Sequence, residues 1–332
     1  MSAAGGVLLL SRSEVAARIS FSECVAAVEA ALIAQAEGRV LRTAVASVPS
    51  EGGGFHVKAG GFPSPLARFV AKVNSNFSGN PERFGLPAIQ GVLLLADAVR
   101  GTPLALMDSI EITIQRTGAA TAVAAKRLAR PDSRVATICG CGAQGRVQAA
   151  ALAHVLPIER FFLCDSDLGR AESLAEHLRQ TLGISAVARK DLQSAVSESD
   201  ICVTCTPSRA PILFPGDVSP GTFLAAVGAD SPDKQELHPE ILARSKVVVD
   251  HIDQCAEFGE LHHAISGGQM RREDVHGDLA GVVSGRIPGR ERPDETIVFD
   301  STGIALEDAA AAALVYERAL AAGVGTRWNP TA

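Results

Sequence analysis

A glycine-rich turn between a strand-like run and a helix-like run constrains the fold of this chain more than any other feature. The run RVATIC (134–139) leads into Gly140, Gly142 and Gly145, and AQGRVQAAALAHVL (143–156) follows. The glycine pattern alone is weak evidence in a chain with 31 glycines, but the flanking strand and helix strengthen it. In such a unit the glycines permit a tight turn, the approach of backbone amides to a pyrophosphate and close helix–strand packing. The N-terminus of the helix attracts the phosphate charge. The segment therefore predicts a dinucleotide-binding loop.

Strand-like and helix-like runs alternate along the rest of this region. RFFLCD (160–165) is followed by a helix from Leu168, and SAVA (185–188) by a short helix. The further strand-like runs are DICVTC, TFLAAVG, KVVVD and ETIVFDS. Alternation of this kind predicts a parallel sheet with right-handed crossovers. The fold class is therefore α/β, with a Rossmann-type, doubly wound parallel sheet.

The first third of the chain has a different pattern. Residues 20–38 predict an amphipathic helix that begins with a capping box of Ser20 and Glu23. Short strand-like runs separated by Gly, Pro and Asn follow over residues 44–108 and predict a mostly antiparallel sheet. An Ala-rich helix is expected from residue 113.

These patterns predict two domains. Residues 1–115 would form a smaller α+β domain for substrate binding and dimerisation, and the C-terminal helix within 303–332 would return to it. Residues 116–302 would form the NAD-binding Rossmann domain, inserted into the first.

An acidic residue at the end of the second strand indicates which dinucleotide binds. Asp165 lies 20 residues after Gly145, where an acid accepts the ribose hydroxyls of an adenosine and repels a 2′-phosphate. Asp167 adds to that repulsion. We therefore expect the cofactor to be NAD(H) rather than NADP(H).

Charge and hydropathy exclude several classes of partner. The 332 residues include 31 Lys and Arg against 37 Asp and Glu, a net charge of −6, and no block of basic residues. We therefore expect no nucleic-acid or membrane-surface partner. No apolar stretch approaches the roughly 20 residues of a membrane span, and the N-terminus lacks the basic region of a secretory signal. A cytoplasmic location is expected.

The cysteines and histidines do not predict a metal site. Seven cysteines are an odd number, and several lie in apolar runs such as ICVTC, which favours buried, reduced thiols over disulfides. The eight histidines show no ligand spacing on a helix, and no second pair of ligands follows Cys139 and Cys141. We expect no bound metal.

Several motifs together resemble the ornithine cyclodeaminase/mu-crystallin family. They are GLPAIQGVLLLADAVRGTPLALMDSIEITIQRTGAATAVAAKRLA, AVGADSPDKQEL and VFDSTGIALEDAAAA. The resemblance extends from residue 40 onward. It implies a homodimer in which the substrate domain forms the interface. The family includes cyclodeaminases, alanine dehydrogenases and imino-acid reductases, so the resemblance alone does not decide the reaction.

The resemblance also implies site residues. For a small α-amino or α-imino acid substrate these are Arg42, His56, Lys58, Lys72 and Arg116. For the cofactor they are Arg116, Gly140, Gly142, Ala143, Gln144, Gly145, Asp165, Thr206, Val227, Gly228, Asp230, Lys234 and Ser301. The catalytic residues would be Lys72 and Asp230.

Two positions depart from the family pattern. Ala88 stands where many members have a threonine. His56 stands where cyclodeaminases carry a glutamate, with Lys58 two residues on and therefore on the same face of a strand.

The chemistry of an α-amino acid agrees with the implied residues. Its carboxylate calls for Arg or Lys, and Lys72 lies in the apolar run FVAKV, where an unpaired ammonium would be costly to bury. Asp230 follows the strand TFLAAVG, at the sheet edge where Rossmann-type domains build their sites, and suits proton transfer at the substrate nitrogen.

Three functions remain open at this level. The leading prediction is an NAD(H)-dependent oxidoreductase that acts on the carbon–nitrogen bond of a small α-amino or α-imino acid. An ornithine cyclodeaminase, a lyase in which NAD is regenerated within one turnover, is the first alternative. A non-catalytic binding protein of the mu-crystallin kind is the second.

Overall fold

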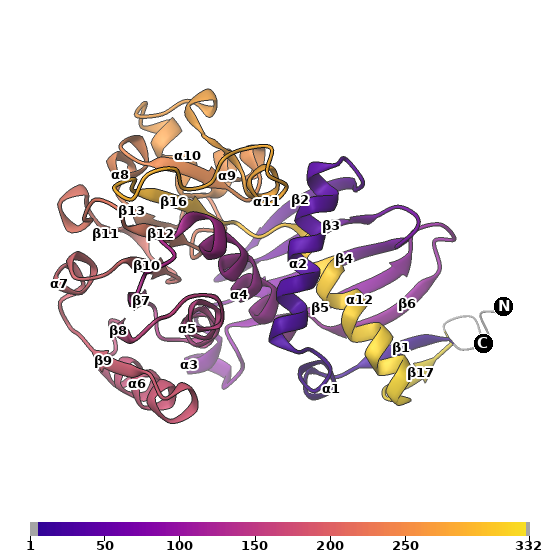
Figure 1. Ribbon diagram of the computed structural model, residues 1–332. Helices are drawn as coiled ribbons and strands as arrows, with labels where there is room; N and C mark the ends of the chain where they lie inside the picture. Colours follow the sequence, from indigo (N-terminus) through magenta and orange to yellow (C-terminus); the bar gives the residue numbers. More distant parts are fainter. Residues whose placement is uncertain (1–5, 330–332) are drawn as a thin grey trace. The chain divides into compact units, whose positions relative to one another are not determined.

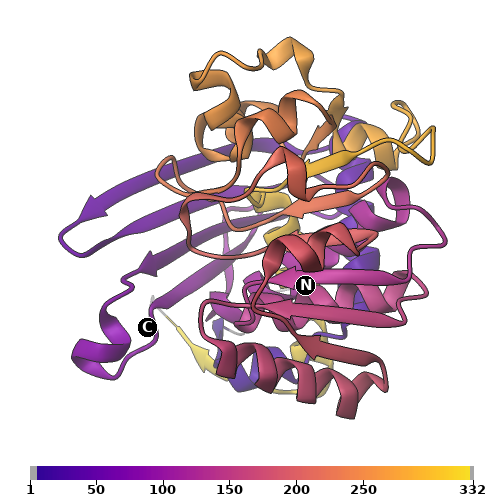
Figure 2. The same ribbon diagram turned by 90° about the vertical axis from the view of Figure 1, so that its left-hand side faces the viewer.

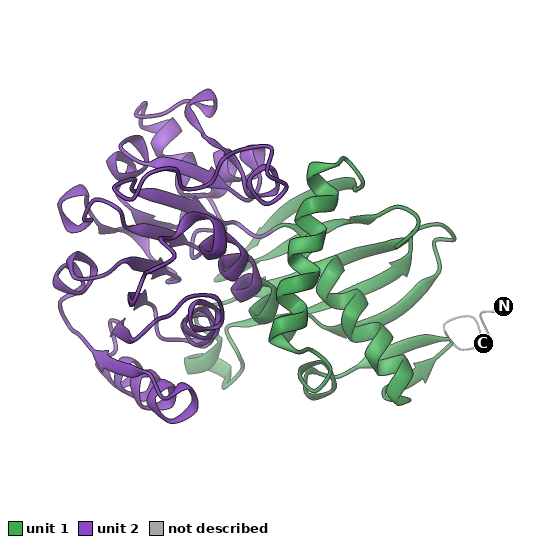
Figure 3. Ribbon diagram, viewed as in Figure 1, with its two compact units in different colours: residues 1–116, 304–332 green, residues 117–303 purple. Residues whose placement is uncertain are grey.

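The computed structural model describes residues 6–329 of the chain. These residues divide into two compact units, shown in two colours in Figure 3. Unit 1 comprises residues 1–116 and 304–332, and unit 2 comprises residues 117–303. The chain therefore leaves unit 1, forms the whole of unit 2 and returns to unit 1.

Unit 2 contains an eight-stranded sheet in its described residues. The order of its strands is β15 (Gly277–Asp278), β14 (Lys246–Val249), β16 (Ile297–Asp300), β12 (Phe223–Ala226), β10 (Ile201–Thr204), β7 (Val135–Cys139), β8 (Arg160–Cys164) and β9 (Ser185–Ala188). Every neighbouring pair is parallel. The strand order reverses between β7 and β10, and a doubly wound sheet binds its ligand at such a point.

Helices cover both faces of this sheet, which is why its strands read as continuous apolar runs. On one face, α5 (Ala143–Val155) packs beside α6 (Leu168–Leu182). The other face lies against α7 (Leu192–Ser197), α8 (Pro239–Ala243), α9 (Ile252–Phe258) and α10 (Glu260–Ser266).

Shorter elements complete unit 2. Strands β11 (Arg209–Leu213) and β13 (Gln235–Leu237) form a separate parallel pair. The 3₁₀ turns η1 (Pro215–Asp217) and η2 (Arg272–Asp274) and helix α11 (Leu279–Val283) lie in the connections.

Unit 1 is built on a seven-stranded sheet in its described residues. The order of its strands is β17 (Thr326–Trp328), β1 (Val7–Leu10), β6 (Pro103–Asp108), β5 (Ile89–Asp97), β4 (Arg68–Asn76), β3 (Gly53–Phe62) and β2 (Leu41–Ser50). The pairing is antiparallel except between β1 and β6, so the predicted antiparallel character holds for most of the sheet. Strands β1 and β17 were not predicted. Figure 2 shows the long β2–β3 hairpin in dark purple.

Two long helices cover one face of this sheet. In Figure 1, α2 (Phe21–Ala36) and α12 (Ala305–Ala322) lie side by side across the strands, and they are in contact. Val70, Leu93 and Leu95 are fully buried on that face. The opposite face exposes apolar side chains instead, namely Val48, Phe55, Val73 and Val92.

Two predictions about helix starts are wrong. Ser20 makes no capping hydrogen bond to α2, and the capping box belongs to Ser11 and Glu14 at the start of the short helix α1 (Arg12–Ala16). The Ala-rich helix α4 (Ser109–Leu128) begins at Ser109 rather than at residue 113. It starts there because Asp108 Oδ1 accepts the N–H groups of Ile110 and Glu111, at 3.1 and 3.0 Å. A further short helix, α3 (Asn80–Phe84), precedes β5.

Candidate functional site

The glycine loop joins β7 to α5 as expected. Gly140 has a φ of 100°, and a Cβ there would lie 2.9 Å from the carbonyl oxygen of Cys205. A Cβ on Gly145 would lie 2.1 Å from the carbonyl oxygen of Gly140, so glycine lets α5 approach the turn. Gly142 begins α5 without a side-chain cap and has open space beside it. The exposed loop at Gly142 and Ala143 therefore fits the pyrophosphate of a dinucleotide.

Asp165 stands half-buried at the end of β8, next to this loop. Its Oδ2 accepts the N–H of Cys141 at 2.7 Å, and its Oδ1 accepts the N–H of Asp167 at 2.9 Å. The Ser166 hydroxyl also donates to Oδ1, at 3.4 Å, so Oδ2 keeps the lone pair that can accept a ribose hydroxyl. Asp167 instead caps α6 by accepting the N–H of Gly169. The residues present fit an adenosine dinucleotide.

Most of the other residues assigned to the cofactor lie on loops that follow β10, β12 and β16. Thr206 follows β10, and the turn from Val227 to Asp230 follows β12. Asp230 forms an ion pair with Lys234, with 2.5 Å between Oδ1 and Nζ. Ser301, after β16, donates its hydroxyl to the buried carboxylate of Asp250. The side chain of Gln144, in the first turn of α5, is half-buried.

A chain of four buried carboxylates supports these loops, and sequence reasoning missed it. Glu236 accepts backbone N–H groups after β10 and β12, and Glu260 accepts those of Glu236 and Leu237. Asp300 accepts the N–H groups that begin α10, and Asp250 accepts the hydroxyls of Ser301 and Thr302. The four acids are fully buried. The signal in the sequence was weak, because Asp300 only follows the apolar run IVF and Glu236 lies among polar residues in DKQEL.

Burial raises the pKa values of three of these four acids. It raises the pKa of Glu236, and it raises the pKa of Glu260 well above its usual range with help from the neighbouring acids. Burial and the nearby Asp250 raise the pKa of Asp300 to about 7. The hydrogen bonds from backbone N–H groups act in the opposite direction.

Unit 1 contains a buried cluster of charged side chains, which we call the ion cluster. Its cations are Lys58, Lys72 and Arg116, and its anions are Glu307 and Asp308 in the first turn of α12. Lys72 Nζ lies 2.7 and 2.8 Å from the two oxygens of Asp308. Arg116 pairs with Glu307 at 2.9 Å and with Asp308 at 3.2 Å.

The strand register explains why the ion cluster needs acids. Lys58 on β3 stands directly opposite Lys72 on β4, and like charges in that position repel each other. The pKa of Lys72 is lowered to about 8, chiefly by burial; Asp308 opposes this shift, and Arg116 and Lys58 contribute to it. Burial alone would raise the pKa of Asp308, but Lys72 and Arg116 hold it below its ordinary value.

The structure therefore brings together three of the residues assigned to the substrate. Lys72 is buried, as its place in FVAKV predicted, and Asp308 supplies an anion for its ammonium group. Glu307 and Asp308 were missed, although two adjacent acids at the start of an Ala-rich helix were a visible signal. Such acids are costly to bury without cations.

The two remaining substrate residues are less buried. His56 shares a face of β3 with Lys58 and contacts Ser47 Oγ through Nδ1 at 3.1 Å. Arg42 is exposed, at the irregular pairing of β2 between Leu41 and Ala44. Their roles stay predictions.

The cysteines near the glycine loop are free thiols. Cys139, Cys141 and Cys164 are buried, and burial raises the pKa of each thiol. Thiols of this kind are poor nucleophiles at neutral pH. Within residues 6–329, no three His, Cys, Asp or Glu side chains are grouped so that they could hold a metal ion.

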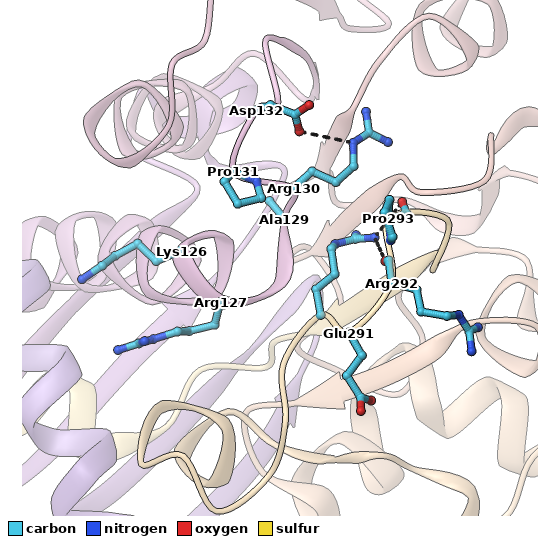
Figure 4. Close-up of a pocket in the computed structure, with 10 residues that line it drawn as sticks. Lys126, Arg127, Ala129, Arg130, Pro131, Asp132, Glu291, Arg292 and Pro293 are labelled. Atoms are coloured by element: carbon cyan, nitrogen blue, oxygen red, sulfur yellow. Dashed lines mark hydrogen bonds and ion pairs between the residues drawn. The ribbon is translucent and has the colours of Figure 1, made fainter.

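One cavity in unit 2, of about 600 Å³, lies away from the glycine loop. Its lining comes from the segments before β7 and β16, at the amino ends of these strands. Figure 4 shows that Lys126 and Arg127 point away from Arg130 and Arg292. Arg130 is turned toward Asp132. These cations do not converge on one point, so the cavity is not a candidate for the reaction site. Of the helices that the structure describes, none has the length and apolar character needed to cross a membrane.

The chain is similar to one protein family over nearly its whole length. The sequence profile of the ornithine cyclodeaminase/mu-crystallin family matches residues 7–323. The alanine dehydrogenase of Archaeoglobus fulgidus is 38% identical over 322 residues, which cover 96% of this chain and 97% of that protein.

Solved structures have the same fold. An archaeal alanine dehydrogenase dimer with bound NAD has a TM-score of 0.93 and 37% identity, over 98% of this chain and 99% of that chain. The Δ1-pyrroline-2-carboxylate reductase of Thermococcus litoralis, in complex with NADH and L-proline, has a TM-score of 0.92 and 35% identity. That comparison covers 97% of this chain and 100% of the other. The α/β fold class predicted from the sequence is confirmed.

Proposed function

Because the chain belongs to the ornithine cyclodeaminase/mu-crystallin family, we propose that it is an NAD(H)-dependent oxidoreductase of small α-amino or α-imino acids. The bond that reacts is the one between the α-carbon and its nitrogen. The similar alanine dehydrogenase and pyrroline-carboxylate reductase structures contain NAD or NADH. The uncapped start of α5 and the carboxylate of Asp165 fit the same cofactor.

The ion cluster is the observation that carries the proposal for the substrate. It gathers three buried cations, Lys58, Lys72 and Arg116, beside Glu307 and Asp308. The carboxylate that every α-amino and α-imino acid has binds to Lys and Arg groups of this kind. We assign this contact to Lys72 and Arg116.

We assign the proton transfer at the substrate nitrogen to Asp230. When NAD is bound, it supplies or accepts the hydride of the reaction. An amine must lose a proton before it gives up hydride, and an imine is reduced as the protonated iminium. Asp230 is partly exposed at the end of the turn after β12 and can exchange a proton with that nitrogen.

We further propose that two copies pack together through unit 1. The sheet face that carries Val48, Phe55, Val73 and Val92 is exposed and apolar, and such faces mark protein interfaces. The similar archaeal alanine dehydrogenase is a dimer. A cytoplasmic location stays a prediction from the sequence.

The test is a panel of substrates followed by NADH absorbance at 340 nm and by ammonia release. L-amino acids with NAD, α-keto acids with ammonia or amines, and cyclic imines with NADH make up the panel. Stoichiometric change of NADH with one of these supports the proposal. Ammonia release from a diamino acid without net NADH change would instead identify a cyclodeaminase. Tight NADH binding without turnover of any compound would identify a binding protein.

A further inference from the structure

The buried acid Glu236, which lies in AVGADSPDKQEL but was not among the predicted site residues, stands at the cofactor edge of unit 2. Glu236 Oε1 accepts the N–H of Thr206 at 2.6 Å, and Oε2 accepts the N–H of Gly228 at 3.0 Å. Thr206 follows β10 and Gly228 follows β12, and these strands are neighbours in the sheet. One carboxylate therefore joins two loops that we assign to the cofactor.

The same carboxylate explains why residue 228 is a glycine. A Cβ on Gly228 would lie 2.4 Å from Glu236 Oε2 and 2.4 Å from the carbonyl oxygen of Thr206. A larger residue would push the carboxylate away from the N–H that it accepts. The glycine is thus required by the close approach of Glu236.

Glu236 also acts on the glycine loop through one peptide group. The N–H of the Cys205–Thr206 peptide points to Glu236, and its carbonyl oxygen packs against Gly140. Cys205 Sγ donates to the carbonyl oxygen of Gly140 at 3.1 Å. The position of this peptide, fixed by Glu236, therefore defines the space beside the glycine loop.

Glu236 is itself held in place by its backbone. Its N–H and that of Leu237 donate to the two oxygens of Glu260, at 2.7 and 3.0 Å. Asp300 in turn accepts the N–H groups of Glu260 and Leu261. A supporting group on such a rigid base keeps a binding site within a few tenths of an ångström of its working geometry.

We propose that Glu236 is a positioning residue of the cofactor site, holding the loops after β10 and β12 at the spacing that the dinucleotide requires. A carboxylate is the side chain for this task because both of its oxygens accept hydrogen bonds, whereas an amide offers one acceptor and a nitrogen that would face the second N–H. The inference rests on the proposed use of NAD(H).

The test compares Glu236→Gln with the wild type by titration of NADH fluorescence. Loss of one hydrogen bond to a charged acceptor predicts a Kd for NADH that is about 10- to 100-fold higher. The kcat at saturating NADH should stay within about threefold, because Glu236 does not take part in the proton transfer that we assign to Asp230. The matched control is Glu240→Gln. Glu240 lies four residues on and pairs with Arg244 at the surface, so the Kd should not change.

Thermal melting without cofactor separates positioning from a purely structural role. A lower Tm of Glu236→Gln with an unchanged Kd for NADH would overturn the inference. If this variant does not fold, Glu236→Asp keeps the charge but shortens the reach, and it should also weaken NADH binding; a normal Kd for that variant would overturn the inference too. Failure of the wild type to bind NADH would contradict the proposed function instead.

Discussion

Lys72 touches both carboxylate oxygens of Asp308, with its Nζ 2.7 and 2.8 Å from them. The acid comes from the first turn of α12, more than 230 residues after the lysine. It counters the repulsion between Lys72 and Lys58 across β3 and β4. This contact raises the pKa of Lys72 against the larger effect of burial, which lowers it.

Replacing Asp308 by Asn should move the alkaline limit of substrate binding to lower pH. The pKa of Lys72 is lowered to about 8 by burial although Asp308 raises it, so without Asp308 it falls further. Lysine is charged below its pKa. As the pH rises, the variant would therefore lose its binding of a carboxylate substrate at a lower pH than the wild type. The pH profile of kcat/KM for the substrate measures this limit. Glu307→Gln is the control, because Glu307 pairs with Arg116, and its alkaline limit should stay near that of the wild type.

Lys72→Ala should raise the substrate KM about 10- to 100-fold or abolish turnover, because a charge-assisted hydrogen bond to the carboxylate is lost. It should also destabilise the fold by about 3–5 kcal/mol, since Asp308 loses one of its cations. NADH affinity should change little. Steady-state kinetics and an NADH titration test the roles, and a collapse of cofactor affinity with an unchanged KM would show that they are wrongly assigned.

The enzyme should prefer NADH to NADPH, because Asp165 repels a 2′-phosphate. Asp165→Ser should reduce the preference for NADH over NADPH by a few kcal/mol at most. It should also weaken NADH binding, since Asp165 accepts the N–H of Cys141 in the glycine loop. The ratio of kcat/KM for the two cofactors measures the preference. Equal values in the wild type would contradict the assignment.

Asp230→Asn should slow hydride transfer about 100- to 10,000-fold, the usual contribution of general acid–base catalysis. The shape of the side chain is kept, but its exchangeable proton and its ion pair with Lys234 are lost. Single-turnover measurements across pH give the rate of this step, and NADH affinity serves as the control. A normal rate with an unchanged pH profile in this variant would show that another group, with His56 as the first candidate, transfers the proton.

Val73→Glu should prevent the dimerisation that we propose through unit 1, because it would bury a charge within the apolar face of the unit 1 sheet. Sedimentation velocity at several concentrations measures the association. Val99→Glu, in the exposed turn after β5, is the matched control and should leave the oligomeric state unchanged. A wild-type chain that sediments as a monomer would refute the proposed packing.

The residues that follow strands of unit 2 could be predicted from the sequence because their chemistry is local. Gly140, Gly142 and Gly145 lie within six residues of each other, and the strand before them and the helix after them can be read from the same short segment. Asp165 was placed by the same reasoning, since it ends the next strand. Alternation of apolar strands and helices fixed the parallel sheet, because crossover connections allow few other arrangements.

The tertiary structure alone decided which acids contact Lys72, Thr206 and Gly228. Asp308 pairs with Lys72, and Glu236 with Thr206 and Gly228, across separations of 236, 30 and 8 residues. A buried carboxylate needs a cation or several N–H groups, but the sequence does not show which of them the fold will bring near it. Strands β1 and β17 were not predicted, because their few residues form strands only by pairing with partners that are distant in the sequence. The short-range pattern thus determined the cofactor loop, whereas long-range packing determined the charge balance of the ion cluster and the support of the loops.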